Sequence, residues 1–345
     1  MIKIYTEKPS GYAHLPILYP NLGVQKWKNL YMGDVFKKIN NPIFTLTENP
    51  AEADFFLFPH DYFLTSNQPA QALELAKKAR KYGKKIIIFG HGDSDQDIPI
   101  PDSIVFRTSQ YRYKIKPNEI IMPAYVEDLS GSDGMQLRSK SRRPIVGFCG
   151  WADFENSRQK IFFYLKRAVL DVQNLFFGRP VVVRRRGLWF RKKVLHALES
   201  SSLVEANFII RNSFSGHVAT IKNSPEEARK EYIDNISNSD FTLAVKGYGN
   251  FSLRFYETLS LGRIPLFINT DCVLPLEDRI DYRDFVVFID YKNLNQVDKI
   301  VADFYENMTG EKFIEMQKRA REVFEKYLRI DAFFALIPDM LNKMK

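Results

Sequence analysis

The segment 239–262 contains the residues with the clearest chemical potential in the chain. A predicted strand ends at Lys246, a glycine-containing loop follows, and a predicted helix begins near Ser252. Ligands bind at the carboxyl ends of strands in open α/β sheets, and helix N-termini attract anions. Arg254, in the first helical turn, can clamp a phosphate with two hydrogen bonds. Glu257 lies three residues later on the same face, where a carboxylate can accept hydrogen bonds from ribose hydroxyls.

The alternative interpretation is a surface ion pair between Arg254 and Glu257, which the same spacing allows. A cation in the first turn opposes the helix dipole, at a cost of about 0.3–1 kcal/mol when it has no partner. A docked anion such as a pyrophosphate would offset this cost. Spacing alone leaves both interpretations open.

Short apolar runs alternate with helical patterns along the whole chain. The apolar residues run together within each strand segment, as in parallel strands that are covered on both faces. A helix is predicted over 68–82 and another from the capping residue Ser224, and a helical tail over 311–341. This alternation predicts an α/β fold with doubly wound parallel sheets. The expected strands are 2–6, 53–59, 84–90, 103–108, 144–150, 241–246, 264–269 and 284–290.

The length of 345 residues is typical of about two domains. Residues 131–143 are rich in Ser, Gly and charge, so we expect them to link a first domain, 1–130, to a second domain, 144–315. Residues 316–345 form the expected helical tail. A hydrophobic content of 45% and a charged content of 26% exclude disorder, collagen and coiled coil as the main state.

The net charge of +9 is concentrated in one region. Between Arg158 and Lys193 there are 11 Lys and Arg against one acidic residue, Asp171. Such a region suits an anionic partner, whether a nucleic acid, an anionic membrane or a phosphorylated small molecule. A solvated helix face is the alternative. No helix-turn-helix, RNP-like or zinc-finger pattern favours nucleic acid.

A longer pattern surrounds the Arg254 and Glu257 pair, and it resembles the signature of the exostosin family of glycosyltransferases. Weaker similarities in 51–63, 84–95, 120–129 and 142–151 extend the resemblance over most of the chain. The residues of the main pattern are Ser239, Phe241, Leu243, Ser252, Arg254, Glu257, Leu259, Gly262, Ile264, Pro265, Ile268, Leu274, Pro275, Asp281 and Phe285.

The resemblance implies a GT-B fold, in which two Rossmann-like domains face each other across a cleft and the C-terminal helix can cross back to the first domain. It implies an inverting transfer of a sugar from a nucleotide-sugar donor, expected to be a UDP-sugar, to a glycan hydroxyl. The first domain would bind the acceptor and the second the donor. No cofactor and no divalent metal are expected, because Arg and a helix N-terminus neutralise the phosphates. Asp93-Ser94-Asp95 has the letters of a metal-binding Asp-x-Asp motif but lies in the predicted acceptor domain.

By matching positions, the resemblance implies that Arg254 binds the diphosphate and Glu257 the ribose. Ser252 and the loop 247–250, which contains Gly249 and Asn250, would support the phosphate. Arg191, near the start of another predicted donor-domain helix, would also reach the donor phosphates.

An inverting reaction needs a general base that deprotonates the acceptor hydroxyl. Three loops at strand ends of the first domain qualify: one with His14, one with Asp61, and the His91–Asp95 turn. We favour Asp93, then Asp61, with His91 as the further candidate. Each of these residues is equally compatible with an ordinary turn or loop position.

The chain departs from the family at Gly262-Arg263-Ile264-Pro265, where Gly-Cys-Ile-Pro is usual. Neither a secretion signal nor an 18-residue apolar run is predicted, and two cysteines, Cys149 and Cys272, favour a reducing compartment. We therefore expect a cytoplasmic enzyme, peripheral to the inner membrane face, that builds a surface polysaccharide on a soluble or lipid-linked glycan. A basic nucleic-acid-binding protein and a GT-B scaffold that binds nucleotide sugars or glycans without turnover are the alternatives.

Overall fold

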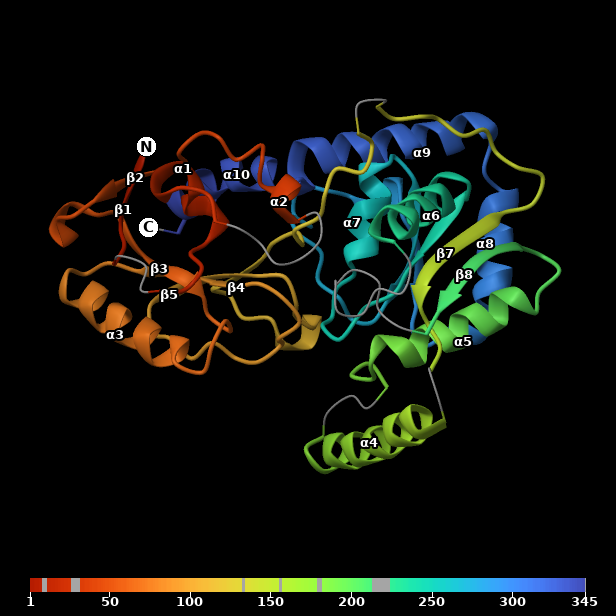
Figure 1. Ribbon diagram of the computed structural model, residues 1–345, viewed down its shortest axis with the longest axis horizontal. Helices are drawn as coiled ribbons and strands as arrows, with labels where there is room; N and C mark the ends of the chain where they lie inside the picture. Colours follow the sequence, from red (N-terminus) through yellow and green to blue (C-terminus); the bar gives the residue numbers. More distant parts are fainter. Residues whose placement is uncertain are drawn as a thin grey trace. The chain divides into compact units, whose positions relative to one another are not determined.

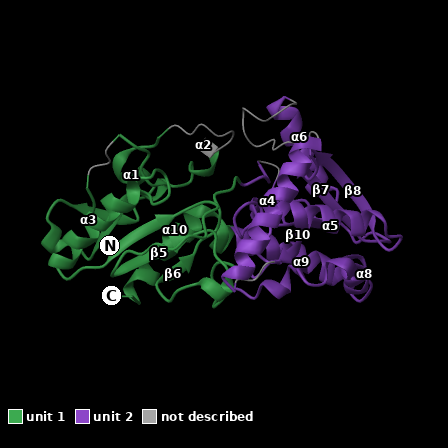
Figure 2. Ribbon diagram, turned by 90° about the horizontal axis from the view of Figure 1, so that it is seen from below, with its two compact units in different colours: residues 1–127, 272–279, 325–345 green, residues 128–271, 280–324 purple. Residues whose placement is uncertain are grey.

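The computed structural model describes residues 1–7, 11–25, 32–131, 134–154, 157–178, 182–212 and 224–344 (Figure 1). The chain divides into two compact units, which Figure 2 shows in different colours. Unit 1 consists of residues 1–127, 272–279 and 325–345, and unit 2 of residues 128–271 and 280–324.

Unit 1 contains a six-stranded parallel sheet with the order β2-β1-β3-β4-β5-β6. The order reverses between β1 and β3, which is the mark of a doubly wound sheet. Four of the predicted strands are confirmed, and β2 and β6 are additional. The strands are β1 (Ile2–Tyr5), β2 (Phe44–Thr47), β3 (Phe55–Asp61), β4 (Ile86–Gly90), β5 (Ser103–Arg107) and β6 (Glu119–Ile121).

Both faces of this sheet are buried, which explains the continuous apolar runs. Phe55 and Leu57 pack into one hydrophobic cluster, and Phe56 and Phe58 into another on the other face. Helix α3 covers the second face through its alanine and leucine side chains. The described helices of unit 1 are α1 (Tyr19–Leu22), α2 (Met32–Val35), α3 (Gln68–Lys81) and α10 (Ile330–Asn342).

Helix α10 belongs to the core of unit 1, although it ends the chain. Phe334 packs against Phe89 and Tyr125 with ring centroids 6.4 Å apart in both pairs. The predicted tail, 316–345, is therefore helical but divided between the two units. Helix α9 stays in unit 2, a π-helical segment over Phe324–Leu328 follows it, and the extended backbone of Arg329 precedes α10.

Unit 2 contains a five-stranded parallel sheet with the order β11-β10-β9-β7-β8. Its order reverses between β7 and β9. The α/β class and the two doubly wound parallel sheets predicted from the sequence are therefore confirmed. The strands are β7 (Ile145–Trp151), β8 (Glu205–Arg211), β9 (Phe241–Ala244), β10 (Ile264–Asn269) and β11 (Val287–Asp290).

Two sets of helices cover this second sheet. Helices α6, α7 and α9 lie over one face, and α5 and α8 pack together over the other (Figure 1). The helix predicted after Ser224 begins there, because the Ser224 Oγ accepts the Glu227 N–H at 3.2 Å. The helices are α4 (Ser157–Phe176), α5 (Gly187–Glu199), α6 (Pro225–Ser237), α7 (Leu253–Ser260), α8 (Val297–Glu306) and α9 (Gly310–Val323).

The expected linker, 131–143, differs from the prediction. Its described part has neither helix nor strand, but it is anchored within unit 2. Arg138 Nε donates to the buried Asp240 carboxylate at 2.9 Å, and the Arg138 backbone exchanges two hydrogen bonds with the Gln317 amide. Arg138 thus ties this segment to β9 and α9, and it does not behave as a free connection.

Arg263 shows what replaces the cysteine of the family pattern. It is buried, and its Nη1 donates to the Gln136 carbonyl oxygen at 2.7 Å while its Nε donates to that of Ser237 at 3.2 Å. Burial lowers the pKa of Arg263 to about 10. The arginine therefore joins three segments inside unit 2. In the described part of the chain, no helix is both long and apolar enough to cross a bilayer.

Candidate functional site

The strand order of unit 2 places a ligand site between the carboxyl ends of β7 and β9. In doubly wound sheets the loops after these two strands turn to opposite faces, which opens a crevice at the point of reversal. The loop after β7 begins at Ala152, and the loop after β9 runs from Val245 to Phe251 before α7 begins. The sequence-predicted donor residues lie on or beside this second loop.

Arg254 reaches the end of β7 from the first turn of α7. Its Nη2 donates to the Cys149 carbonyl oxygen at 2.7 Å, and its guanidinium lies 4.3 Å from the centre of the Phe148 ring. Its buried Nε has no hydrogen-bond partner. Gly150 makes room for it: a Cβ there would lie 2.7 Å from Arg254 Nη2, and the φ of +153° suits glycine.

Arg191 brings a second cation to the same place from α5. Its Nη1 donates to the Trp151 carbonyl oxygen at 3.1 Å and its Nη2 to that of Lys246 at 3.3 Å, so it bridges the ends of β7 and β9. Its buried Nε also has no partner. Burial, and secondarily the charge of Arg254, lower the pKa of Arg191 to about 9.

Two half-buried guanidinium groups at one point are unfavourable without an anion. Like charges raise the free energy of each other's charged form, and burial adds a desolvation cost. A buried N–H without a partner also loses its hydrogen bond to water. Among the described residues neither Arg191 Nε nor Arg254 Nε has a partner, so the arrangement suits a ligand with anionic oxygen acceptors.

Glu257 has a partner other than Arg254. The Tyr232 hydroxyl, from α6, donates to Glu257 Oε2 at 2.5 Å. Burial first, and then the charge of Glu257, raise the pKa of Tyr232 well above its usual value. Because Arg254 donates to Cys149 and Glu257 accepts from Tyr232, the simple surface ion pair does not describe these residues. Glu257 is a carboxylate held by Tyr232, one turn after Arg254 on α7.

The remaining predicted donor residues form the turn into α7. Ser252 is the N-cap residue, buried, and its side chain makes no capping hydrogen bond. Asn250 is buried, accepts from Thr270 Oγ1 at 2.7 Å and donates to the Asp271 carbonyl oxygen at 3.2 Å. Asn250 therefore fastens the loop to the end of β10, and Gly249 lies within that loop.

Sequence reasoning missed the close approach of α5 to this loop. A Cβ on Gly187 would lie 1.8 Å from the Lys246 carbonyl oxygen, and the Gly187 N–H donates to the Gly247 carbonyl oxygen at 3.0 Å. Lys246 itself is buried, and its Nζ donates to the Val183 carbonyl oxygen at 2.6 Å. Tyr248 is exposed at the tip of the loop. The signal in the sequence was Gly187 at the start of a helix, next to three arginines.

In unit 1, Asp61 lies at the carboxyl end of β3, beside the point where the strand order reverses. Its Oδ1 accepts the Phe63 N–H at 2.9 Å and its Oδ2 accepts the His91 N–H at 2.6 Å. Burial raises the pKa of Asp61 to about 6, in spite of these two hydrogen bonds. A carboxylate with this pKa is suited to accept a proton near neutral pH.

His91 follows β4 and lies next to Asp61. Its ring stacks on Tyr125, with centroids 3.9 Å apart and planes at 11°. Burial lowers the pKa of His91 to about 4, so the ring is neutral at pH 7. The His91 Nε2 and the Tyr125 hydroxyl are both buried, and neither has a hydrogen-bond partner among the residues that the structure describes. These two polar groups, with Asp61, form a second place where a ligand can complete hydrogen bonds.

Asp93 differs from these residues because it is exposed. The buried Arg107 stabilises the turn that contains Asp93, because its Nη2 donates to the Ser94 carbonyl oxygen at 2.9 Å. Asp95 is the second acid of the Asp-x-Asp letters, and its Oδ2 lies 3.9 Å from Lys114 Nζ. Across the described ranges, no three His, Cys, Asp or Glu side chains are placed to hold a metal ion. In the remaining candidate loop, His14 Nε2 lies 2.9 Å from the Gly23 carbonyl oxygen.

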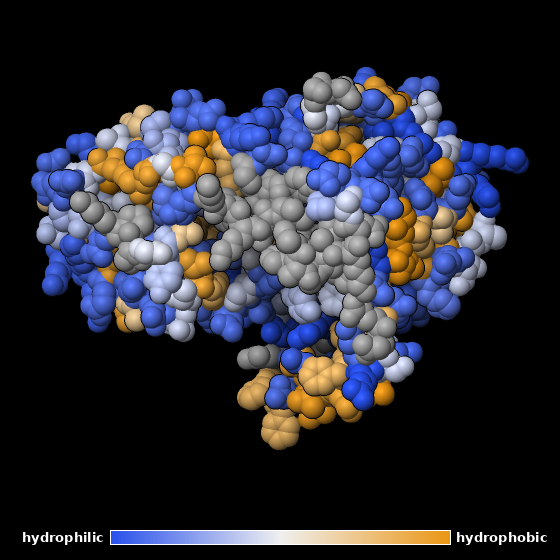
Figure 3. Space-filling view, in the orientation of Figure 1, coloured by the Kyte–Doolittle hydropathy of each residue, from blue (hydrophilic) through white to orange (hydrophobic). Residues whose placement is uncertain are grey.

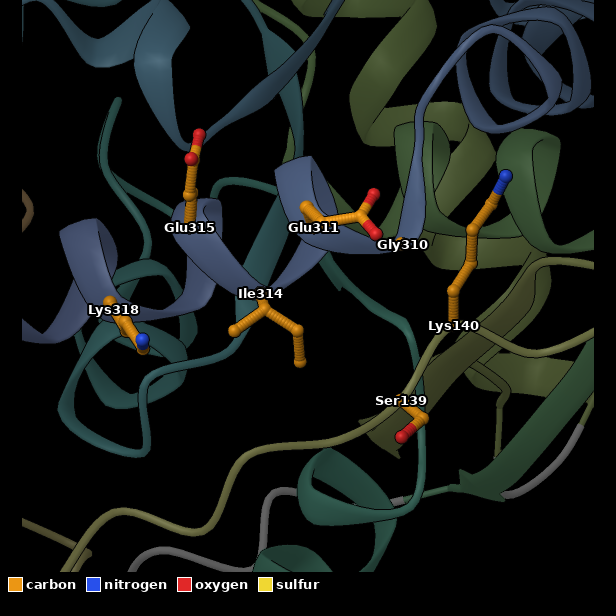
Figure 4. Close-up of a pocket in the computed structure, with 7 residues that line it drawn as sticks. All are labelled: Ser139, Lys140, Gly310, Glu311, Ile314, Glu315 and Lys318. Carbon is orange, nitrogen blue, oxygen red and sulfur yellow. The ribbon is translucent and has the colours of Figure 1, made fainter.

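A hollow of about 480 Å³ also lies in unit 2, at the start of α9 (Figure 4). Two lysine and two glutamate side chains line it, and none of its residues comes from the loops after β7 or β9. It is therefore separate from the arginine pair. Its lining residues are Ser139, Lys140, Gly310, Glu311, Ile314, Glu315 and Lys318.

A segment that lies mostly in unit 2 matches a known domain family. Residues 180–304 match the family model described as the Exostosin GT47 domain. Arg191, Arg254 and Glu257 all fall within this match. This segment of the chain is similar to the exostosin GT47 domain. The resemblance to the exostosin family inferred from the sequence pattern is therefore confirmed over this segment, which includes the arginine pair.

The chain is 30% identical to Exostosin-1 of Drosophila melanogaster over 102 residues, which are 30% of this chain and 13% of that protein. It is 27% identical over 129 residues to a probable glucuronosyltransferase of Oryza sativa subsp. japonica, which are 36% of this chain and 28% of that protein. The chain thus spans less than a third of the length of these two relatives. Among solved structures, Anabaena HepE in complex with UDP-glucose aligns over 99% of this chain and 100% of that one, at 10% identity and a TM-score of 0.42.

Proposed function

We propose that this protein is an inverting glycosyltransferase that moves a sugar from a nucleotide-sugar donor, a UDP-sugar in the first instance, to a hydroxyl of a glycan acceptor. The observation that carries the proposal is the pair Arg191 and Arg254, which lies at the sheet reversal of an exostosin GT47 domain with an unpartnered Nε on each side chain. Two guanidinium groups so placed can donate hydrogen bonds to the oxygens of two adjacent phosphates.

In the proposed reaction, the acceptor oxygen attacks the anomeric carbon and a new C–O bond forms there. The bond from that carbon to the donor diphosphate breaks, and the nucleoside diphosphate leaves with the electron pair. The acceptor hydroxyl loses its proton to a general base. Stabilising the charge that develops on the leaving oxygen is the largest task of the protein in such a step.

Arg254 and Arg191 would supply that stabilisation. Both guanidinium groups are fixed before the donor binds, through carbonyl oxygens at the ends of β7 and β9. Fixed donors need no reorganisation as charge develops. Glu257, held by Tyr232, would accept from the ribose hydroxyls. Because two cations already neutralise the diphosphate, the proposal includes no metal and no cofactor.

Asp61 is the base that the geometry favours. Its raised pKa keeps it a stronger proton acceptor than an ordinary carboxylate, yet it is mostly ionised at pH 7. His91 and Tyr125 offer unpartnered polar atoms beside it that could hold the acceptor. Asp93, favoured by the sequence, and His91 stay as the alternative bases. The facing arrangement of the two domains across a cleft also stays a prediction.

We also propose that the reaction belongs to the synthesis of a surface polysaccharide or other glycan and takes place in the cytoplasm, peripheral to the inner membrane face. The basic region between Arg158 and Lys193 supports an anionic partner there. The alternatives are a nucleic-acid-binding protein and a GT-B scaffold that binds without turnover.

A thermal-shift screen separates the first alternative from the proposal. UDP, GDP, CMP and ADP are each added to the protein with EDTA, with Mg²⁺ or with Mn²⁺, and an oligonucleotide serves as the competing ligand. A ligand at 100 times its Kd adds about 2.7 kcal/mol of stability, which is a clear rise in melting temperature. A metal-independent shift with one nucleoside diphosphate supports the proposal. A shift with the oligonucleotide alone contradicts it.

Turnover separates the enzyme from the scaffold. The donor selected by the screen, as its sugar conjugate, is incubated with the protein and glycan acceptors, and released nucleoside diphosphate is measured. The proposal expects release that depends on the acceptor and that Asp61→Asn abolishes without changing the donor-induced shift. Donor binding without any release, with every acceptor, would favour the scaffold.

A further inference from the structure

Helix α4 has no buried residue along its 20 residues. It lies next to α5 (Figure 1), and one stripe of side chains holds it there. The Asp171 carboxylate pairs with the Arg185 guanidinium at 3.1 Å. The Arg167 guanidinium lies 5.9 Å from the centre of the Trp189 ring on α5. The centre of the Phe163 ring lies 5.3 Å from that of the Phe154 ring. These positions are four residues apart, so they form one face of the helix.

The opposite face of α4 is apolar and exposed. Leu165 is 62% exposed and Phe176 is 89% exposed. Figure 3 shows apolar residues gathered on this helix. The apolar residues recur at intervals of three and four, as on one side of a helix. They are Ile161, Phe162, Leu165, Val169, Val172 and Phe176.

This polarity is the reverse of that of an ordinary surface helix. A helix packed on a globular domain turns its apolar stripe inward and its charges outward. Here Arg167 and Asp171 face the protein, and the apolar stripe faces away from it. A contiguous exposed apolar face of this kind marks a surface that another partner covers.

The charges of α4 identify the chemistry of that partner. Besides Arg167 and Asp171, which pair with each other on the side that faces the protein, the helix carries Arg158, Lys160 and Lys166 and no further acid. Lys166 lies at the edge of the apolar face, with its Nζ 5.8 Å from the centre of the Phe162 ring. An apolar face rich in aromatic residues and bordered by basic side chains is typical of helices that lie in the plane of an anionic membrane. The flanking cations then meet lipid phosphates.

We propose that α4 docks this protein on an anionic lipid bilayer, with its apolar face in the boundary between headgroups and acyl chains. A second copy of the chain is a poorer occupant, because pairing two such helices would bring their basic side chains together. The proposal goes beyond sugar transfer and holds whether or not the chain is an enzyme, since it concerns only how α4 is covered.

Vesicle co-sedimentation tests this docking with the full chain. Vesicles of phosphatidylglycerol and phosphatidylcholine in equal parts are compared with vesicles of phosphatidylcholine alone. The test variant is Leu165→Asp with Val169→Asp, which places two charges in the exposed apolar face. The matched control is Leu203→Asp, which changes an exposed apolar residue of unit 2 outside α4. Circular dichroism and thermal denaturation establish that all variants are folded.

The wild-type chain is expected to sediment with the anionic vesicles, less so at high salt, and only weakly with phosphatidylcholine alone. The double variant should lower the partition coefficient by about 100-fold, and Leu203→Asp should not change it. Absence of binding by the wild-type chain, or equal binding by the double variant, would overturn the proposal. So would a wild-type dimer in sedimentation equilibrium that the same double variant converts to a monomer.

Discussion

Replacing Arg254 with methionine removes the charge while keeping a long side chain over Phe148. In the unbound protein, Arg254 Nη2 donates to the Cys149 carbonyl oxygen at 2.7 Å. That contact leaves the unpartnered Nε and the other Nη for a phosphate. Arg254→Met therefore deletes two hydrogen bonds to the proposed donor and one hydrogen bond within the protein.

The two effects differ in size. A hydrogen bond to a charged group contributes about 1.5–3 kcal/mol, so two at the lower value amount to about 3 kcal/mol. That loss raises Kd roughly 150-fold. Within the unbound protein, the lost hydrogen bond costs about 1 kcal/mol. The removal of the positive charge near Arg191, whose pKa Arg254 lowers, offsets part of this cost. Donor binding should therefore fail while the fold persists.

Isothermal titration calorimetry with the nucleoside diphosphate that stabilises the wild-type protein measures the effect. Arg319→Met is the matched control, because it removes one positive charge from unit 2 at α9, where Arg319 pairs with Glu322 at 2.9 Å. The control should keep the wild-type Kd within about twofold, in line with the small energies of surface ion pairs. A wild-type Kd for Arg254→Met would refute the assignment of Arg254 to the diphosphate.

Gly187→Ala should lower the free energy of unfolding, measured by urea denaturation, by about 3 kcal/mol, because the new Cβ would lie 1.8 Å from the Lys246 carbonyl oxygen. The control Gly310→Ala adds a Cβ in open space and should stay within about 1 kcal/mol of wild type. Equal effects of the two variants would contradict the close approach of α5 to the loop. Asp61→Asn should lower the rate of sugar transfer at least about 100-fold. The rate of the wild-type protein should fall as the pH drops through about 6, because Asp61 becomes protonated. A wild-type rate that does not change below pH 6 would exclude Asp61 as the base. Burial raises the pKa of Asp61 from 3.8 to about 6, so this group lowers the free energy of unfolding as the pH rises from 3.8 to about 6. Burial lowers the pKa of His91 from 6.5 to about 4, so this group raises the free energy of unfolding as the pH rises from about 4 to 6.5. In Asp61→Asn only the His91 effect is left, so the free energy of unfolding should rise more steeply with pH from 4 to 6.5 than in wild type, measured by urea titrations at each pH.

The strands that the sequence predicted are mostly the inner strands of the two sheets. Their two faces are both covered, so their sequences are continuous apolar runs such as that of β4. The strands it missed, β2, β6 and β8, are all at sheet edges. Edge strands are partly exposed and carry polar residues, as the half-exposed β8 shows, so their composition resembles that of loops.

The predicted tail is helical, but the sequence did not predict that it divides between the two units. Its apolar periodicity continues through α9 and α10, and periodicity cannot show that the two helices enter different cores. The break is a local backbone event, a π-helical segment followed by the extended Arg329. Phe333 and Phe334 then pack into unit 1, while Phe313 packs with Tyr305 in unit 2.

The sequence by itself determined the α/β class of the fold and the resemblance of the segment around Arg254 and Glu257 to the exostosin pattern, and it predicted that these two residues bind the donor. These depend on local order: a strand, a loop and the first turn of a helix within 20 or so residues. Only the tertiary structure decided that Arg191 meets Arg254, that Tyr232 holds Glu257, and that Asp61 is buried while Asp93 is exposed. Proximity of charges and loss of solvent arise when distant segments pack together, and no spacing along the chain records them.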